Sequence, residues 1–178
     1  RYRYVSLSRR VWMRRGVFIA GALLVGLAAV GFAGIANSAQ DLYSYILTTY
    51  PMLPLVMTPA CFAVLAYVTM RWFPAAAGSG IPQVIAARKS SDQLHVRALL
   101  GWQTTVAKIV MTALALAAGA SVGREGPTVQ VGASVMFAVA TVAGLGRRNG
   151  FVLAGSAAGI AAAFNAPIAG ILFAIEEL

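Results

Sequence analysis

The sequence is poor in acidic residues, cysteine and histidine. Among 178 residues there are five Asp or Glu, one Cys and one His. Cys61 has no partner for an internal disulfide, so we expect a small hydrophobic residue packed among its neighbours. His95 lies in the polar stretch KSSDQLHVR without a second ligand residue, which argues against a metal site. We expect no metal and no other cofactor.

Charge of either sign is scarce, and hydrophobic residues make up 60% of the chain. A helix that spans a bilayer needs about 20 mainly apolar residues. Long stretches with little or no charge occur at 16–70, in which Asp41 is the one charge, 109–123, 128–146 and 149–175, and several of them meet this demand. The composition therefore predicts a polytopic integral membrane protein in contact with the lipid bilayer.

The formal net charge of +9 raises the possibility of nucleic-acid binding, but the positions of the basic residues argue against it. Six arginines lie within residues 1–15, and four more basic residues flank one polar loop: Arg71, Arg88, Lys89 and Arg97. Basic residues beside apolar spans are typical of cytoplasmic flanks. We therefore expect no nucleic-acid partner, a basic cytoplasmic segment at 1–15 and a membrane domain at 16–178.

The pattern along the chain predicts an all-α fold, because no stretch alternates in polarity as a strand would. The expected elements are a span at 16–36, an outer turn at 37–45, a span at 51–73, a short helix from Pro82, a span at 98–120, and helices from Pro127 to 143, at 151–163 and from Pro167 onward. Gly155 and Gly159 form a GxxxG pair typical of close helix packing.

Three of these helices follow the same kind of break: GSGIP at 78–82, GREGP at 123–127 and FNAP at 164–167. Proline is favoured in the first turn of a helix, and the residue types before it permit special backbone angles or cap the helix. A helix start carries unpaired N–H groups and a partial positive charge, and inside a bilayer such a start can hold an anion. Broken or re-entrant helices are used in this way by transporters.

The first two breaks predict an anion site, in which Ser79 lends a hydroxyl donor and glycines let backbone amides approach. Glu125 is itself an anion, and its carboxylate is a candidate gate that competes for the site and carries a proton. The candidate residues are Gly78, Ser79, Gly80, Ile81, Gly123, Arg124, Glu125 and Gly126. Each break also has a simpler interpretation: a turn with a helix cap for GSGIP, an Arg124–Glu125 pair that fixes a loop or an ordinary acid at a helix start for GREGP, and helix capping for Asn165.

Glu176 and Glu177 end the last helix, where the helix dipole disfavours carboxylates. Acidic residues in membrane segments are candidates for proton relays. The alternative is that both simply mark a helix end at the water interface. An enzyme is not expected, because GSAAG at 155–159 is no GxSxG motif and His95 lies in a polar loop.

In this order, GSGIP, GREGPTVQ and AAAFNAPIAGILFAIEE resemble the CLC family of chloride channels and proton–chloride antiporters. The resemblance implies a helical membrane fold of two inverted halves, a homodimer with one anion pathway per subunit, and a place in a bacterial inner membrane. It also implies that Ser79 coordinates the central anion and favours chloride, that Glu125 is the gating glutamate, and that Glu177 is the internal proton glutamate of antiporters.

The resemblance thus favours proton-coupled chloride exchange, with a passive voltage- or pH-gated channel as the alternative. Such proteins carry a second half with a GxFxP-type motif and a tyrosine at the inner side of the site. The sequence reaches Leu178 without either, so we expect it to be an N-terminal portion of a longer transporter. A half without transport activity of its own is the further alternative.

Overall fold

The computed structural model describes residues 9–145 and 149–178, and within these ranges every regular element is a helix. The elements are α1 (Arg9–Thr49), α2 (Leu53–Trp72), the 3₁₀ turn η1 (Pro74–Ala76), α3 (Ile81–Lys89), α4 (Gln93–Leu100), α5 (Trp102–Ala117), α6 (Glu125–Val142), α7 (Asn149–Phe164) and α8 (Pro167–Glu176). The all-α prediction is confirmed. Residues 1–8 of the expected basic segment, and Arg147 and Arg148, lie outside the described residues.

The first helix is longer than the sequence pattern suggested. α1 runs without interruption through the stretch 37–45, so the outer turn expected there is wrong, and the helix extends beyond the expected span 16–36 at both ends. The stretch NSAQDLYSY is polar but contains neither Gly nor Pro, and polarity alone does not end a helix. The chain turns at Tyr50–Met52, beside Pro51, where the residue before a proline is driven out of the α region.

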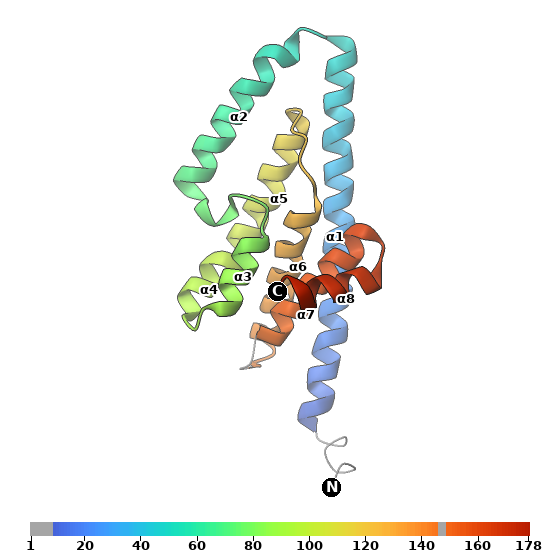
Figure 1. The fold of residues 1–178 in the computed structure, drawn as a ribbon, viewed down its shortest axis with the longest axis vertical. Coiled ribbons are helices and arrows are strands. Elements are labelled where there is room, and N and C mark those ends of the chain that lie inside the picture. Colours follow the sequence, from blue (N-terminus) through green and yellow to red (C-terminus); the bar gives the residue numbers. More distant parts are fainter. Residues whose placement is uncertain (1–8, 146–148) are drawn as a thin grey trace.

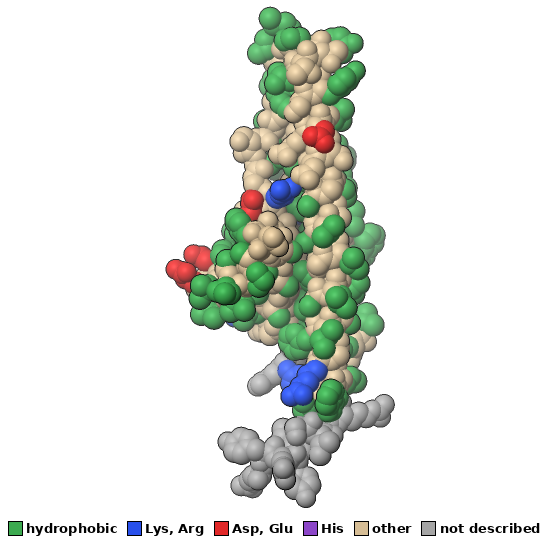
Figure 2. Space-filling model, turned by 90° about the vertical axis from the view of Figure 1, so that its right-hand side faces the viewer, with side chains coloured by type: hydrophobic (Ala, Val, Ile, Leu, Met, Phe, Trp, Pro, Cys, Tyr) green, Lys and Arg blue, Asp and Glu red, His purple; other side chains and the backbone are tan. Residues whose placement is uncertain are grey.

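α1 and α2 form an antiparallel pair that diverges from the turn, with the remaining helices packed beside and between them (Figure 1). Within the described residues, three stretches could cross a membrane by length and composition: Val11–Thr49, Leu53–Trp72 and Gln93–Ala117. Large apolar side chains on α1 and α2 point outward, among them Leu27 at 70% and Leu55 at 71% exposure. Figure 2 shows such side chains along the length of the molecule. Exposed apolar surface of this extent is typical of a membrane interface.

The span expected at 98–120 is divided in two. α4 ends at Leu100 and α5 begins at Trp102, because Gly101 adopts an extended backbone with φ −70° and ψ 157°. The start of α4 is capped by Asp92, whose carboxylate accepts a hydrogen bond of 2.9 Å from the Leu94 N–H. The break directs α4 back against α3.

The core lies between α6 and α7, which approach closely through small residues. A Cβ atom at Gly132 or Gly155 would overlap with the backbone of the other, and one at Gly159 would lie 2.6 Å from the Thr128 carbonyl oxygen. The close helix packing predicted from the GxxxG pair is confirmed. Val84, Val129 and Phe137 belong to the cluster of buried apolar residues around this contact, which holds the start of α6 in place.

Candidate functional site

The GSGIP stretch forms a tight turn that leads directly into α3. Gly78 and Gly80 have φ values of +68° and +105°, which residues with a side chain rarely adopt. The first hydrogen bond of the helix runs from the Val84 N–H to the Gly80 carbonyl oxygen. The N–H groups of Ile81 and Gln83 precede that bond and so belong to the unpaired first turn.

The GREGP stretch begins α6 beside this turn. Glu125 is the first residue of α6, so the helix starts two residues before Pro127, where the sequence pattern had placed its start. Proline is tolerated within the first turn because its missing N–H would have no helical acceptor. A Cβ atom at Gly126 would lie 2.6 Å from the Ser79 carbonyl oxygen, and one at Gly80 would lie 2.9 Å from the Gly126 carbonyl oxygen. The two helix starts are therefore in direct backbone contact.

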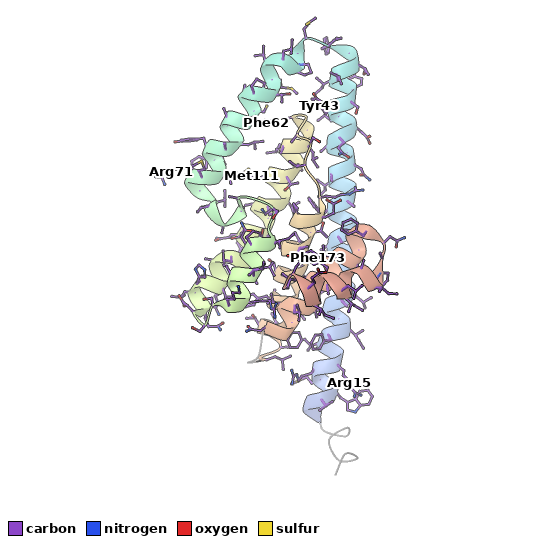
Figure 3. The ribbon with its side chains drawn as sticks, in the orientation of Figure 1. Arg15, Tyr43, Phe62, Arg71, Met111 and Phe173 are labelled. Carbon is purple, nitrogen blue, oxygen red and sulfur yellow. The ribbon has the colours of Figure 1, made fainter. Side chains whose placement is uncertain are left out.

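Both helix starts open onto one cavity of about 560 Å³. Six of the eight candidate anion-site residues line it: Gly78, Ser79, Ile81, Gly123, Glu125 and Gly126. Gly80 lies behind the cavity, buried against α6, and Arg124 points elsewhere. The rest of the lining includes Lys108, Met111 and Thr112 from α5; Figure 3 shows Met111 on the side of α5 that faces α2.

Lys108 is a buried cation in this wall, with 2% of its surface exposed. Its ammonium group donates hydrogen bonds to the carbonyl oxygens of Ala76 at 2.6 Å, Gly78 at 2.8 Å and Ala77 at 3.4 Å. The sequence left the partner of this lysine open, because a residue of α5 and a turn some thirty positions earlier meet only in the folded chain. The lysine brings a positive charge next to the turn that carries Ser79.

Two glutamines donate hydrogen bonds to backbone carbonyl groups in and near this turn. Gln83 donates from Nε2 to the Ala77 carbonyl oxygen. Gln130 is fully buried in α6 and donates from Nε2 to the carbonyl oxygens of Leu99 at 3.0 Å and Ala75 at 3.3 Å. Sequence reasoning missed both residues. For Gln130 the available signal was a polar residue, the glutamine of GREGPTVQ, inside an otherwise apolar helix.

Arg124 does not pair with Glu125. Its guanidinium instead donates a 2.7 Å hydrogen bond from Nη1 to the Asn37 side-chain oxygen on α1. Arg124 and Glu125, both among the described residues, form no ion pair. The structural pair considered as an alternative for GREGP is therefore wrong. The Glu125 side chain instead folds back over Gly123, since a Cβ atom at Gly123 would overlap with Glu125 Oε2.

The third break lies apart from this cavity. Asn165 has a φ of +51° and ends α7, and the Ala166 N–H donates to the Ala161 carbonyl oxygen at 3.0 Å. The helix cap expected from Asn165 at the start of α8 is wrong, because the N-cap residue there is Ala166 and no side chain caps it; Asn165 instead follows the end of α7 in a left-handed conformation. Glu176 and Glu177 are exposed at the end of α8, which packs on α7, and neither lines the cavity.

The comparison with protein families agrees with this arrangement. A family model described as voltage gated chloride channel matches residues 61–178, which include all three helix breaks and the lining of the cavity from Thr69 to Pro127. This match covers well over half of the chain. The family transports chloride across membranes and is not a family of enzymes. The chain therefore belongs to the voltage gated chloride channel (CLC) family of integral membrane proteins.

Proposed function

We propose that the cavity between α3, α5 and α6 is the chloride site of a proton-coupled chloride exchanger. The observation that carries the proposal is the meeting of two helix starts at one cavity lined by Ser79 and Glu125. Helix N-termini carry partial positive charge and unpaired N–H donors, so two of them that face one space favour an anion there. Lys108 adds a full positive charge to the same wall.

Glu125 acts in this proposal as the gate. Its carboxylate is an anion tethered at the N-terminus of α6, where negative charge is stabilised, and it competes with chloride for the same donors. When Glu125 takes up a proton, the competition ends and chloride occupies the site. One side chain thereby links the movement of chloride to the movement of a proton.

Glu177 is proposed as the second proton-transfer residue, with Glu176 beside it. The support comes from the resemblance of FAIEE to the antiporter motif and from the family match that extends through residue 178. The two glutamates lie at the exposed end of α8, outside the cavity that Glu125 lines. Protons would then pass between Glu177 and Glu125 while chloride passes Ser79.

The test is transport by the full-length protein reconstituted in liposomes under an imposed chloride gradient, with chloride and proton movement recorded together. We expect proton uptake to accompany chloride efflux in the wild type. Glu125→Gln mimics permanent protonation, so chloride flux should persist without proton movement. Glu177→Ala should also remove proton movement and retain chloride flux.

Asp92→Asn serves as the control, because this acid caps α4 outside the cavity and should keep proton coupling intact. The alternative is a passive chloride channel with Glu125 as a simple gate. Chloride flux without proton movement in the wild type, or coupling that survives Glu177→Ala, would favour the channel.

The same proposal extends to assembly and location. We place the exchanger as a homodimer in a bacterial inner membrane, with residues 1–15 at the cytoplasmic face. Its proposed substrates are chloride and protons, and we expect no cofactor. Arg14, Arg15 and Arg71 support this orientation as basic residues near the ends of apolar spans.

A further inference from the structure

The segment between α5 and α6, residues 118–124, immediately precedes Glu125 and makes three contacts with α1 and α2. It is not a helix, and three of its N–H groups bond back to α5: Ala118 to Leu114 at 2.9 Å, Gly119 to Leu116 at 3.0 Å and Ala120 to Ala115 at 2.8 Å. Beyond Ala120 the segment has no helical hydrogen bonds until the Thr128 N–H donates to the Arg124 carbonyl oxygen. Its position therefore depends on contacts from other elements.

Two of these contacts hold the beginning of the segment. The Thr58 hydroxyl on α2 donates a 2.8 Å hydrogen bond to the Ala118 carbonyl oxygen. The ring of Tyr43 on α1 lies against Gly119, where a Cβ atom would come within 2.5 Å of ring carbons. Gly119 has a φ of +92°, so a side chain there would be strained as well as obstructed. Figure 3 shows Tyr43 between α1 and this segment.

The third contact holds its end, next to the proposed gate. Arg124 donates from Nη1 to the Asn37 Oδ1 atom on α1 at 2.7 Å. Arg124 immediately precedes Glu125, and it is the residue whose carbonyl oxygen accepts the first hydrogen bond of α6. A shift of Arg124 is thus transmitted to the helix start that carries the Glu125 side chain.

We infer that α1 and α2 form a brace that positions the gate, and that Asn37, Tyr43 and Thr58 are positioning residues for Glu125. The three residues precede the stretch 61–178 that matches the family model, whereas the segment that they contact lies within it. The inference rests on the proposed role of Glu125. Of the three contacts, the Asn37–Arg124 bond lies nearest to the gate and provides the sharpest test.

The test combines Asn37→Ala, Asn37→Asp and the neighbouring control Ser38→Ala in the full-length protein reconstituted in liposomes. Asn37→Ala removes the acceptor of Arg124, whereas Asn37→Asp retains an oxygen at the same place. Loss of a hydrogen bond to a charged group has a free-energy cost that corresponds to about a tenfold change. We therefore expect an approximately tenfold fall in proton-coupled chloride flux for Asn37→Ala. Asn37→Asp should restore the flux, and Ser38→Ala should leave it unchanged.

Each variant is also made in the Glu125→Gln background, where no gate remains to be positioned. There we expect Asn37→Ala to leave chloride flux unaltered. Hydrogen–deuterium exchange of residues 118–124 adds a readout that does not depend on transport. The Gly119 and Ala120 amides should exchange faster in Asn37→Ala and at the wild-type rate in Asn37→Asp.

An equal loss of flux in both backgrounds would assign Asn37 a purely structural role and overturn the inference, as would unchanged exchange of the segment. If Glu125→Gln alone behaves as wild type, the gate itself is refuted and the positioning role falls with it. Faster exchange in Asn37→Ala would in that case still establish that α1 holds the segment.

Discussion

At the scale of single residues, Lys108 shows how a charge is kept inside an apolar protein. An ion placed in a low-dielectric interior is costly unless polar groups surround it. The three carbonyl oxygens of Ala76, Ala77 and Gly78 provide these groups. In return, the lysine holds the Ser79 turn against α5, so its charge and its hydrogen bonds both contribute to the site.

Replacement of this lysine tests that dual role. Lys108→Met keeps a similar volume but removes the ammonium group, which leaves carbonyl oxygens of the turn without their donor. We expect a loss of about 1–3 kcal/mol in the free energy of unfolding, as for other buried groups left unpaired, together with weaker chloride binding. Denaturation in detergent and chloride titration by calorimetry measure the two effects. Lys89→Met, at an exposed position, should change neither.

Gly126 sets the distance between the two helix starts. Gly126→Ala would place a methyl group 2.6 Å from the Ser79 carbonyl oxygen, which is backbone and cannot rotate away. We expect overpacking to lower the free energy of unfolding by about 1–3 kcal/mol and to reduce chloride flux. Gly26→Ala on α1, where nothing lies within 4 Å of the added atom, should instead stabilise its helix slightly. Equal flux in both variants would contradict a close contact between the helix starts.

At the scale of elements, the continuity of α1 determines what the N-terminal part of the chain can reach. At about 1.5 Å per residue, its 41 residues extend about 60 Å, roughly twice the ~30 Å thickness of a hydrocarbon core. The last four turns of α1 are the part that contacts the segment before α6 through Asn37 and Tyr43. A turn at 37–45 would have removed both contacts.

A proline substitution distinguishes a helix from a turn in this stretch. Gln40 is exposed on α1, so Gln40→Pro meets no packing obstacle but removes a helical hydrogen bond. We expect a loss of about 3 kcal/mol in the free energy of unfolding, measured against Gln40→Ala, which should be neutral or slightly stabilising. A proline variant as stable as the alanine variant would mean that the stretch is a turn.

At the scale of the whole molecule, the exposed apolar surface of α1 and α2 requires a nonaqueous surrounding. Leu23, Val30 and Val56 are all at least two-thirds exposed, and they occupy the helices that are long and apolar enough to span a bilayer. We expect the expressed protein to stay in the membrane pellet after extraction with alkaline carbonate and to be released only by detergent. Release into the carbonate supernatant would exclude an integral protein.

Sequence alone determined the helical class, the membrane character and the three broken helices with their prolines. These follow from local rules, because hydropathy, uncharged length and the special angles of Gly, Asn and Pro act within a few residues of one another. Ser79 and Glu125 could be proposed as partners for the same reason, since each stands at a helix start. The expected turn at 37–45 failed because polarity was given more weight than the absence of a helix-breaking residue.

Only the tertiary structure decided which of these local features meet. It placed Ser79 and Glu125 on one cavity, left Glu176 and Glu177 outside it, and gave Lys108 and Arg124 their partners. Contacts between residues thirty to ninety positions apart depend on how whole helices pack, and packing is fixed by the summed fit of many side chains rather than by any short pattern. The residues that could hold an anion can be recognised in the sequence, whereas their position around one cavity depends on the fold.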